Sequence, residues 1–300
     1  MSGLAVKVCD RKEKGWSCAV SAVTLSLVHV MFGATLIAGV VLLTGSLMDN
    51  VHVNLGLQHY SESLSLLSTA FLPMPLNTIV NVGYVAVGVF WIRHVHSLLT
   101  GGAISVDDAY LMFVLAWMLV LYGPVQFVRI VTHWRVAGIL DQWYTLPIFA
   151  WVGVSCREIG RPCGRCNIWS VGIIMAVSVA SYGLTLLHRY GFEVALAAHI
   201  TGVVAQAWWV HHRSSSERNR QRRRAAFFRA VLCCFGFVTL KLADWRLVRL
   251  LPIPFAVFTG HFWSKVADFM QAHYSCRFLE ASLPTGLDSG TETVYDRKHE

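Results

Sequence analysis

Ionisable side chains interrupt the long apolar stretches of this chain at Asp141, Asp244, His261 and Lys265. His261, Lys265 and Asp268 recur at positions i, i+4 and i+7, so they lie on one face of a helix. A buried ammonium without a partner is costly, so we expect one of the three aspartates to lie close to Lys265. Such a cluster could be a proton relay, a ligand counter-ion or part of a metal-supported site. We favour a buried ion pair that holds helices together.

Amide side chains form a second polar pair. Asn77 and Asn81 are separated by one helical turn, within an otherwise apolar stretch. Polar side chains inside a membrane bundle commonly hydrogen-bond across helices. We therefore predict that both asparagines bond to neighbouring helices.

The elements that would carry these residues are apolar runs of membrane-spanning length. The 300 residues are 55% hydrophobic and only 14% charged, whereas a soluble domain has about 25% charged residues. A bilayer core of about 30 Å needs roughly 20 apolar residues in a helix, and helices satisfy their own backbone groups there. The sequence predicts an all-α, polytopic membrane bundle of eight spans: Cys18–Leu47, Leu76–Trp91, Tyr110–Val131, Ile139–Cys156, Ile168–Leu187, Phe192–His212, Ala226–Leu242 and Val257–Phe278.

The distribution of positive charge predicts the topology. The formal net charge is +8, and much of the excess lies in the segment Arg213–Arg229, between two predicted spans. This is ordinary cytoplasmic-side composition, so we exclude nucleic acid as a partner and place both termini in the cytoplasm. Residues 1–17 are then a cytoplasmic tail, 18–280 a helical membrane domain and 281–300 a disordered cytoplasmic tail.

Four strings of residues stand out in this sequence: Leu121–Gln126, Leu140–Trp151, Gly191–Leu196 and Gly260–Val266. They resemble sequences of the transmembrane protein 187 family. Residues that match the family follow in the same order from about His52 to Phe278, which is most of the chain. The resemblance implies a multi-pass membrane protein of a family without an established biochemical activity.

A fainter resemblance connects the chain to alkaline ceramidases and related seven-helix hydrolases. Asn77-Thr-Ile-Val-Asn81 is similar to a motif of their first core helix, and Leu140-Asp141 to one after their second. Lys241-Leu-Ala-Asp244 resembles part of their sixth helix, and His261 falls where their last helix begins its paired histidines. The resemblance implies a seven-helix core preceded by one added N-terminal helix.

The zinc-binding residues of those hydrolases are largely replaced. The resemblance places Ile130 and Lys265 where two of their three histidines stand, and Gln126 where they have a serine. His133 could serve only if the register slipped. Catalytic zinc needs three protein ligands and an open position, and a cationic lysine would oppose it. We predict no metal and no cofactor, and we hypothesise that the Lys265 ammonium takes the vacated place and pairs with Asp141.

These observations favour a non-enzymatic lipid-binding, ligand-binding or scaffold protein of an internal, secretory-pathway membrane. Its partners would be membrane lipids and unidentified proteins. A lipid amide hydrolase with a rebuilt site is the alternative, and a small-molecule transporter is the third, disfavoured because inverted repeats are not apparent. The predicted polar core comprises Asp141, Asp244, His261, Lys265, Gln126, Asn77, Asn81 and Asp268.

Overall fold

The computed structural model describes residues 14–55, 62, 74–159, 168–213 and 217–283. These residues form helices and connecting turns, and none of those ranges contains a strand. The helices are α1 (Lys14–Leu43), α2 (Gly45–Met48), α3 (Pro75–Ile79), α4 (Val82–Thr100), α5 (Val106–Thr132), α6 (Arg135–Ile159), α7 (Ile168–Ser181), α8 (Leu184–Leu187), α9 (Gly191–Arg213), α10 (Glu217–Leu242), α11 (Asp244–Leu250), α12 (Pro252–Val257) and α13 (Gly260–Glu280).

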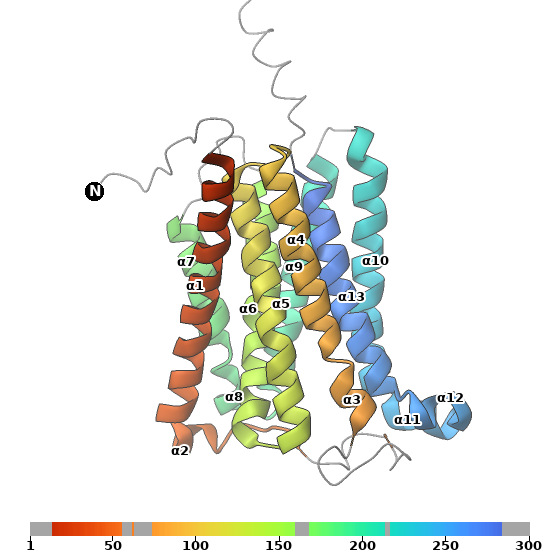
Figure 1. Cartoon of the computed structure of the whole chain (residues 1–300). Helices are drawn as coiled ribbons and strands as arrows, with labels where there is room; N and C mark the ends of the chain where they lie inside the picture. The colour runs from red at the N-terminus through yellow and green to blue at the C-terminus, as the bar shows by residue number, and fades with distance from the viewer. Residues whose placement is uncertain (1–13, 56–61, 63–73, 160–167, 214–216, 284–300) are drawn as a thin grey trace, which may run out of the picture.

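The long helices stand side by side and alternate in direction (Figure 1). The start of α1 and the end of α13 lie at the same end of the bundle. The short helices α2, α3, α8, α11 and α12 gather at the opposite end. We call the first the terminal end of the bundle and the second the short-helix end. The arrangement is that expected for a chain that enters and leaves a bilayer repeatedly.

Five helical segments of the described chain are long and apolar enough to cross a membrane, which confirms the prediction of an all-α membrane bundle. The remaining long helices, α6, α9 and α13, do not meet that criterion of length and composition. Two of them carry the predicted polar core, since Asp141 lies on α6 and Lys265 on α13. The five segments are Ala19–Leu43, Pro75–Thr100, Val106–Thr132, Ile168–Leu187 and Asn219–Leu242.

The bundle has a central layer and a periphery. In the most apolar part of α5, 56% of the residues are buried, whereas in α7 only 17% are. The helix α5 packs against α1, α4 and α6, and α10 packs mainly along α13. Trp91, Phe113 and Leu115 are fully enclosed in this core. Central helices face protein, so they can hold polar groups that a lipid-facing helix could not.

Helix ends differ from the predicted ones where polar residues cap or extend them. The helix α1 begins at Lys14, within the predicted tail. Ser105 accepts a hydrogen bond from the Asp108 backbone and so starts α5 earlier than predicted. Pro147 lies inside α6. Most of the two predicted tails, residues 1–13 and 284–300, lies outside the described residues.

Two glycines allow α4 and α5 to approach closely. A Cβ added at Gly88 would lie 2.6 Å from the Ala116 carbonyl oxygen, and one added at Gly123 would lie 3.0 Å from the Asn81 carbonyl oxygen. Small residues at such crossings let helix backbones meet, which strengthens packing between membrane helices. This contact fixes α4 beside the polar side chains of α5.

Candidate functional site

An ion pair between Arg129 and Asp141 joins the facing ends of α5 and α6. Arg129 lies in the last turn of α5 and is 6% exposed, and Asp141 on α6 is 4% exposed. The Arg129 Nη1 donates to Asp141 Oδ2, and its Nη2 donates to the Asn54 carbonyl oxygen at 3.2 Å. His133, which ends α5 in the left-handed conformation (φ 51°), begins the tight turn that makes this pairing possible.

The second oxygen of Asp141 accepts hydrogen bonds from two further α5 side chains. Tyr122 donates its hydroxyl to Asp141 Oδ1 at 2.8 Å, and the Gln126 amide nitrogen donates to the same oxygen. Thr145 lies 2.9 Å from the Tyr122 hydroxyl and bonds back to the Asp141 carbonyl oxygen. Three donors from one helix thus surround a carboxylate from the next.

Lys265 bonds to an amide oxygen, so the hypothesis that it pairs with Asp141 is wrong. Its Nζ donates to Gln126 Oε1 at 2.7 Å and lies 5.9 Å and 6.0 Å from the ring centroids of Tyr84 and Tyr122. Asp141 is already neutralised by Arg129, a residue outside the predicted polar core. The Gln126 amide connects the two because it offers an acceptor to the lysine and a donor to the carboxylate.

Asp268 completes this cluster on α13. It is buried, and it accepts a hydrogen bond from the Tyr84 hydroxyl. Lys265 and Asp268 lie near enough to attract each other electrostatically, although they make no direct ion pair. We call Tyr84, Tyr122, Gln126, Arg129, Asp141, Lys265 and Asp268 the central network. Its two cations and two carboxylates balance, and its hydrogen bonds link α4, α5, α6 and α13.

Asp244 and His261 contact each other at the short-helix end, and neither takes part in the hydrogen bond between Lys265 and Gln126. Asp244 Oδ1 accepts from the His261 backbone N–H at 3.0 Å, and both residues are buried. Thr259 starts α13 by accepting from the Phe262 backbone, and its hydroxyl lies 3.4 Å from Asn77 Oδ1. These bonds satisfy donors at the first turn of α13, as helix caps do.

The asparagines behave differently from each other. Asn77 reaches the neighbouring helix through Thr259, as predicted. Asn81 instead donates to the carbonyl oxygens of Asn77 and Thr78 on its own side of the helix break. The break between α3 and α4 interrupts the regular helical bonding here: the Asn81 backbone N–H bonds to the Thr78 carbonyl at 3.3 Å, and the Asn81 side chain adds two local bonds.

Glu62 caps the start of α3, a role that the sequence pattern did not indicate. Its two carboxylate oxygens accept from the backbone N–H groups of Leu76 and Asn77, each at 3.1 Å. Burial raises the pKa of Glu62 above its ordinary value, although those two backbone hydrogen bonds act in the opposite direction. Glu62 stands outside the predicted helices, and only its two hydrogen bonds to the start of α3 identify it.

The residues at the zinc-ligand positions of the hydrolases do not form a ligand set. Ile130 is buried and apolar, Lys265 bonds to Gln126, and His133 ends α5. Across the described part of the chain, no three His, Cys, Asp or Glu side chains lie close enough together to hold a metal ion. The arrangement can hold helices in register, because its hydrogen bonds join α4, α5, α6 and α13.

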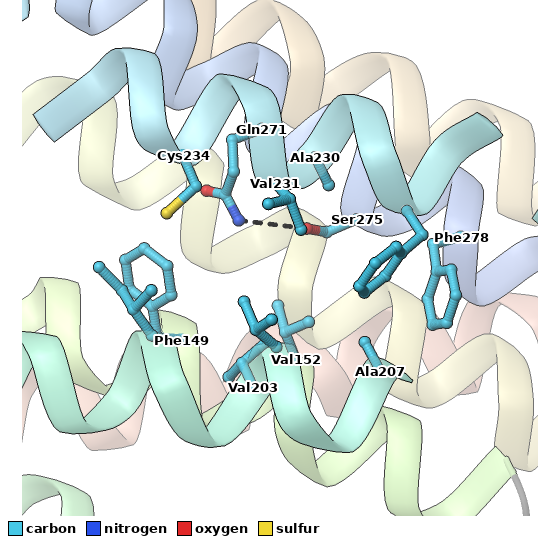
Figure 2. Close-up of a pocket in the computed structure, with 13 residues that line it drawn as sticks. Phe149, Val152, Val203, Ala207, Ala230, Val231, Cys234, Gln271, Ser275 and Phe278 are labelled. Atoms are coloured by element: carbon cyan, nitrogen blue, oxygen red, sulfur yellow. Dashed lines mark hydrogen bonds between the residues drawn. The ribbon is translucent and has the colours of Figure 1, made fainter. Parts of the chain in front are cut away.

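A groove lies between α6, α9, α10 and α13 (Figure 2). Its enclosed volume is about 40 Å³, its mouth is open, and its walls are almost entirely apolar. The polar exception is Gln271, which donates to the Ser275 hydroxyl at 3.2 Å. Sequence analysis missed this groove because its residues look like ordinary core. The other lining residues are Phe149, Val152, Ile200, Val203, Val204, Ala207, Phe227, Ala230, Val231, Cys234 and Phe278.

Comparison with known proteins agrees with the order of motifs along the chain. The model of the TMEM187 protein family matches residues 26–280, which takes in α4–α13 and most of α1. The chain belongs to the TMEM187 family. Transmembrane protein 187 of Homo sapiens is 43% identical over 254 residues, covering 85% of this chain and 91% of the relative. Its counterpart in Bos taurus is 38% identical over 262 residues, covering 85% of this chain and 95% of the relative.

No solved structure matches the chain. The TMEM187 relatives confirm the sequence resemblance and, with the apolar helices, an integral membrane protein. The matched segment includes the central network and the groove. Both features therefore lie within the part of the chain that defines the family.

Proposed function

We propose that this TMEM187 family member is a non-enzymatic membrane protein that crosses the bilayer eight times and binds a membrane lipid in the groove beside α9 and α10. The groove carries the proposal, because it is an apolar recess in the wall of a bundle whose surroundings are lipid. Acyl chains are the solvent at that depth, so a recess lined by valine, alanine and phenylalanine is complementary to them.

The proposed eight crossings add α6, α9 and α13 to the five apolar segments. These three helices have 25, 23 and 21 residues, enough to span about 30 Å. The charged side chains Asp141, Lys265 and Asp268 are all buried inside the bundle, so they do not face lipid. An even number of crossings also agrees with the common end of α1 and α13 (Figure 1).

The packing of α10 supports a lipid-accessible groove. This helix packs mainly along α13 and makes few contacts with α9. Val203 and Val204 of α9 and Val231 of α10 are only half-buried, so the space between the two helices opens outward. A chain entering there would meet the Phe149 and Phe278 rings and the hydrogen-bonded Gln271 and Ser275 at the back (Figure 2).

The central network has a structural role in this proposal. Its charges balance within the bundle, and its hydrogen bonds bring α4, α5, α6 and α13 together. A rigid α6 and α13 would hold two walls of the groove at a fixed separation. Neither hydrolysis nor transport is favoured by an observation on these residues.

The proposal is tested by filling the groove. We expect Ala230→Trp, which places an indole in the recess, to remove the phospholipid that co-purifies with the wild-type protein in mild detergent. The measurement is native mass spectrometry of the intact protein. The matched control is Leu232→Trp on the same helix, because Leu232 is 69% exposed and faces away from the groove. Equal lipid retention by Ala230→Trp and the wild type would exclude the groove as the binding site.

A further inference from the structure

A cluster of arginines stands where α9 ends and α10 begins. Arg213 is the last residue of α9, and Arg220, Arg222, Arg223 and Arg224 occupy the first turns of α10. This is the terminal end of the bundle (Figure 1). Ala207 and Phe227, which line the groove, lie about one or two turns from these arginines along their own helices. The basic cluster therefore continues directly from one end of the groove.

Arg223 and His211 close the seam between α9 and α10 at that end. Arg223 is 1% exposed, and its Nη2 donates to the His211 carbonyl oxygen at 3.5 Å. The His211 ring stacks on Phe227, with ring centroids 6.2 Å apart and planes 6° apart. The guanidinium groups of Arg220, Arg223 and Arg224 all lie close enough to the His211 ring to interact with it electrostatically. Their positive charges are therefore gathered near this seam.

Two other guanidinium groups of the cluster lie beside aromatic rings. Arg213 lies 4.8 Å from the Trp209 ring centroid, and Arg224 lies 5.8 Å from that of Phe228. Arg220, Arg222 and Arg224 are exposed. Aromatic rings beside cations are typical of the depth at which lipid headgroups meet the hydrocarbon. Within the described ranges, neither Arg213 nor Arg224 forms an ion pair with a carboxylate.

We propose that Arg220 and Arg224 bind the phosphate-bearing headgroup of an anionic phospholipid whose acyl chain lies in the groove. The guanidinium fork matches phosphate oxygens through paired hydrogen bonds, and basic pockets between helices on the cytoplasmic side select anionic headgroups. The inference rests on the proposed lipid-binding function and names the class of lipid. Charge at one end and an apolar recess beyond it fit a lipid better than a free phosphate.

The test uses the full chain, reconstituted with equal amounts of palmitoyl-oleoyl phosphatidylserine and the matching phosphatidylcholine and then extracted for native mass spectrometry. We expect the wild type to retain the anionic lipid about thirtyfold in preference, as two arginines near a headgroup would give. The double variant Arg220→Gln/Arg224→Gln should lose this preference and keep its total bound lipid. Arg246→Gln/Arg249→Gln, at exposed arginines of α11 at the short-helix end, is the matched control and should behave as the wild type.

The outcomes separate the two proposals. If Arg220→Gln/Arg224→Gln keeps the preference while Ala230→Trp abolishes lipid retention, the headgroup assignment is wrong and the groove stands. If the arginine variant loses the preference but Ala230→Trp retains lipid, the acyl chain lies elsewhere and the combined site is overturned. Full competition by soluble glycerophosphoserine would also overturn it, since the headgroup alone would then suffice. Arg220→Lys/Arg224→Lys, which keeps the charge, should retain a partial preference and so distinguish lost binding from misfolding.

Discussion

Asp141 is the residue on which the buried charges converge. Arg129 pairs with one of its oxygens, and Tyr122 and Gln126 donate to the other. A carboxylate so enclosed is stable only while its counter-ion stays in place, because an unpaired buried charge has lost its hydration. The arginine is therefore as necessary as the aspartate, although only the aspartate belongs to a recognisable motif.

Removing Arg129 should be among the most damaging changes in the chain. We expect Arg129→Leu to lower the free energy of unfolding by about 3–5 kcal/mol, since it leaves Asp141 without its cation. The double variant Arg129→Leu/Asp141→Leu should recover part of that loss. Unfolding in mixed detergent micelles measures both.

The control for this experiment is Arg93→Leu on α4, an exposed arginine, which we expect to change the same free energy by less than about 0.5 kcal/mol. A double variant no more stable than Arg129→Leu would contradict the pairing. An equal effect of Arg93→Leu would show that loss of any positive charge is enough.

At the residue scale, sequence reasoning found the buried aspartates, the lysine and Gln126, but it misassigned their partners. The predicted polar core did not include Arg129, which stands near a helix end. The sequence feature that could have revealed this pair is the short connection at His133 and Trp134. It folds α6 back onto α5, so Arg129 and Asp141 lie opposite each other. Lys265 did find a polar partner, but an amide, which no count of opposite charges could reveal.

At the scale of elements, the crossing of α4 and α5 depends on the absence of side chains at Gly88 and Gly123. We expect Gly88→Ala to destabilise the protein by about 1–3 kcal/mol, because the added methyl would lie 2.6 Å from a backbone oxygen and from Val120. Thermal unfolding of the detergent-solubilised protein measures this.

Gly172→Ala on α7 is the matched control. A Cβ at Gly172 has no neighbour within 4 Å, so the change should be neutral or should stabilise α7 by about 0.5–1 kcal/mol. Destabilisation of equal size by the two variants would contradict the α4–α5 contact as the cause, because Gly172 makes no such contact.

Hydropathy identifies the helices whose side chains face lipid more clearly than the helices whose side chains face protein. The helices α1, α7 and α10 are apolar on nearly all sides, so hydropathy identifies them directly. The helices α6 and α13 carry polar residues of the interior, so they are not apolar enough to be recognised as membrane spans by composition. The groove could not be predicted, because it depends on how far α10 stands from α9 and not on any motif.

At the scale of the whole molecule, the proposed topology places both chain ends and the arginine cluster in the cytoplasm. The sequence has no Asn-x-Ser/Thr glycosylation site, so an inserted one reports its own location. We expect a sequon-bearing loop inserted between His188 and Arg189, near the start of α9, to be glycosylated. The same loop appended after Glu300 should remain unmodified. Glycosylation of the appended loop would contradict the proposed orientation, and gel mobility before and after glycosidase treatment measures it.

The position of Lys265 on α13 has a consequence for biogenesis. Its hydrogen-bond partner Gln126 and the Tyr84 and Tyr122 rings belong to α4 and α5, which leave the ribosome long before α13 does. A helix bearing a lysine and an aspartate inserts poorly by itself, since each charge at mid-bilayer opposes entry by about 3 kcal/mol. We therefore expect the earlier helices to assist the insertion of α13, because they offer its lysine a polar partner inside the bilayer.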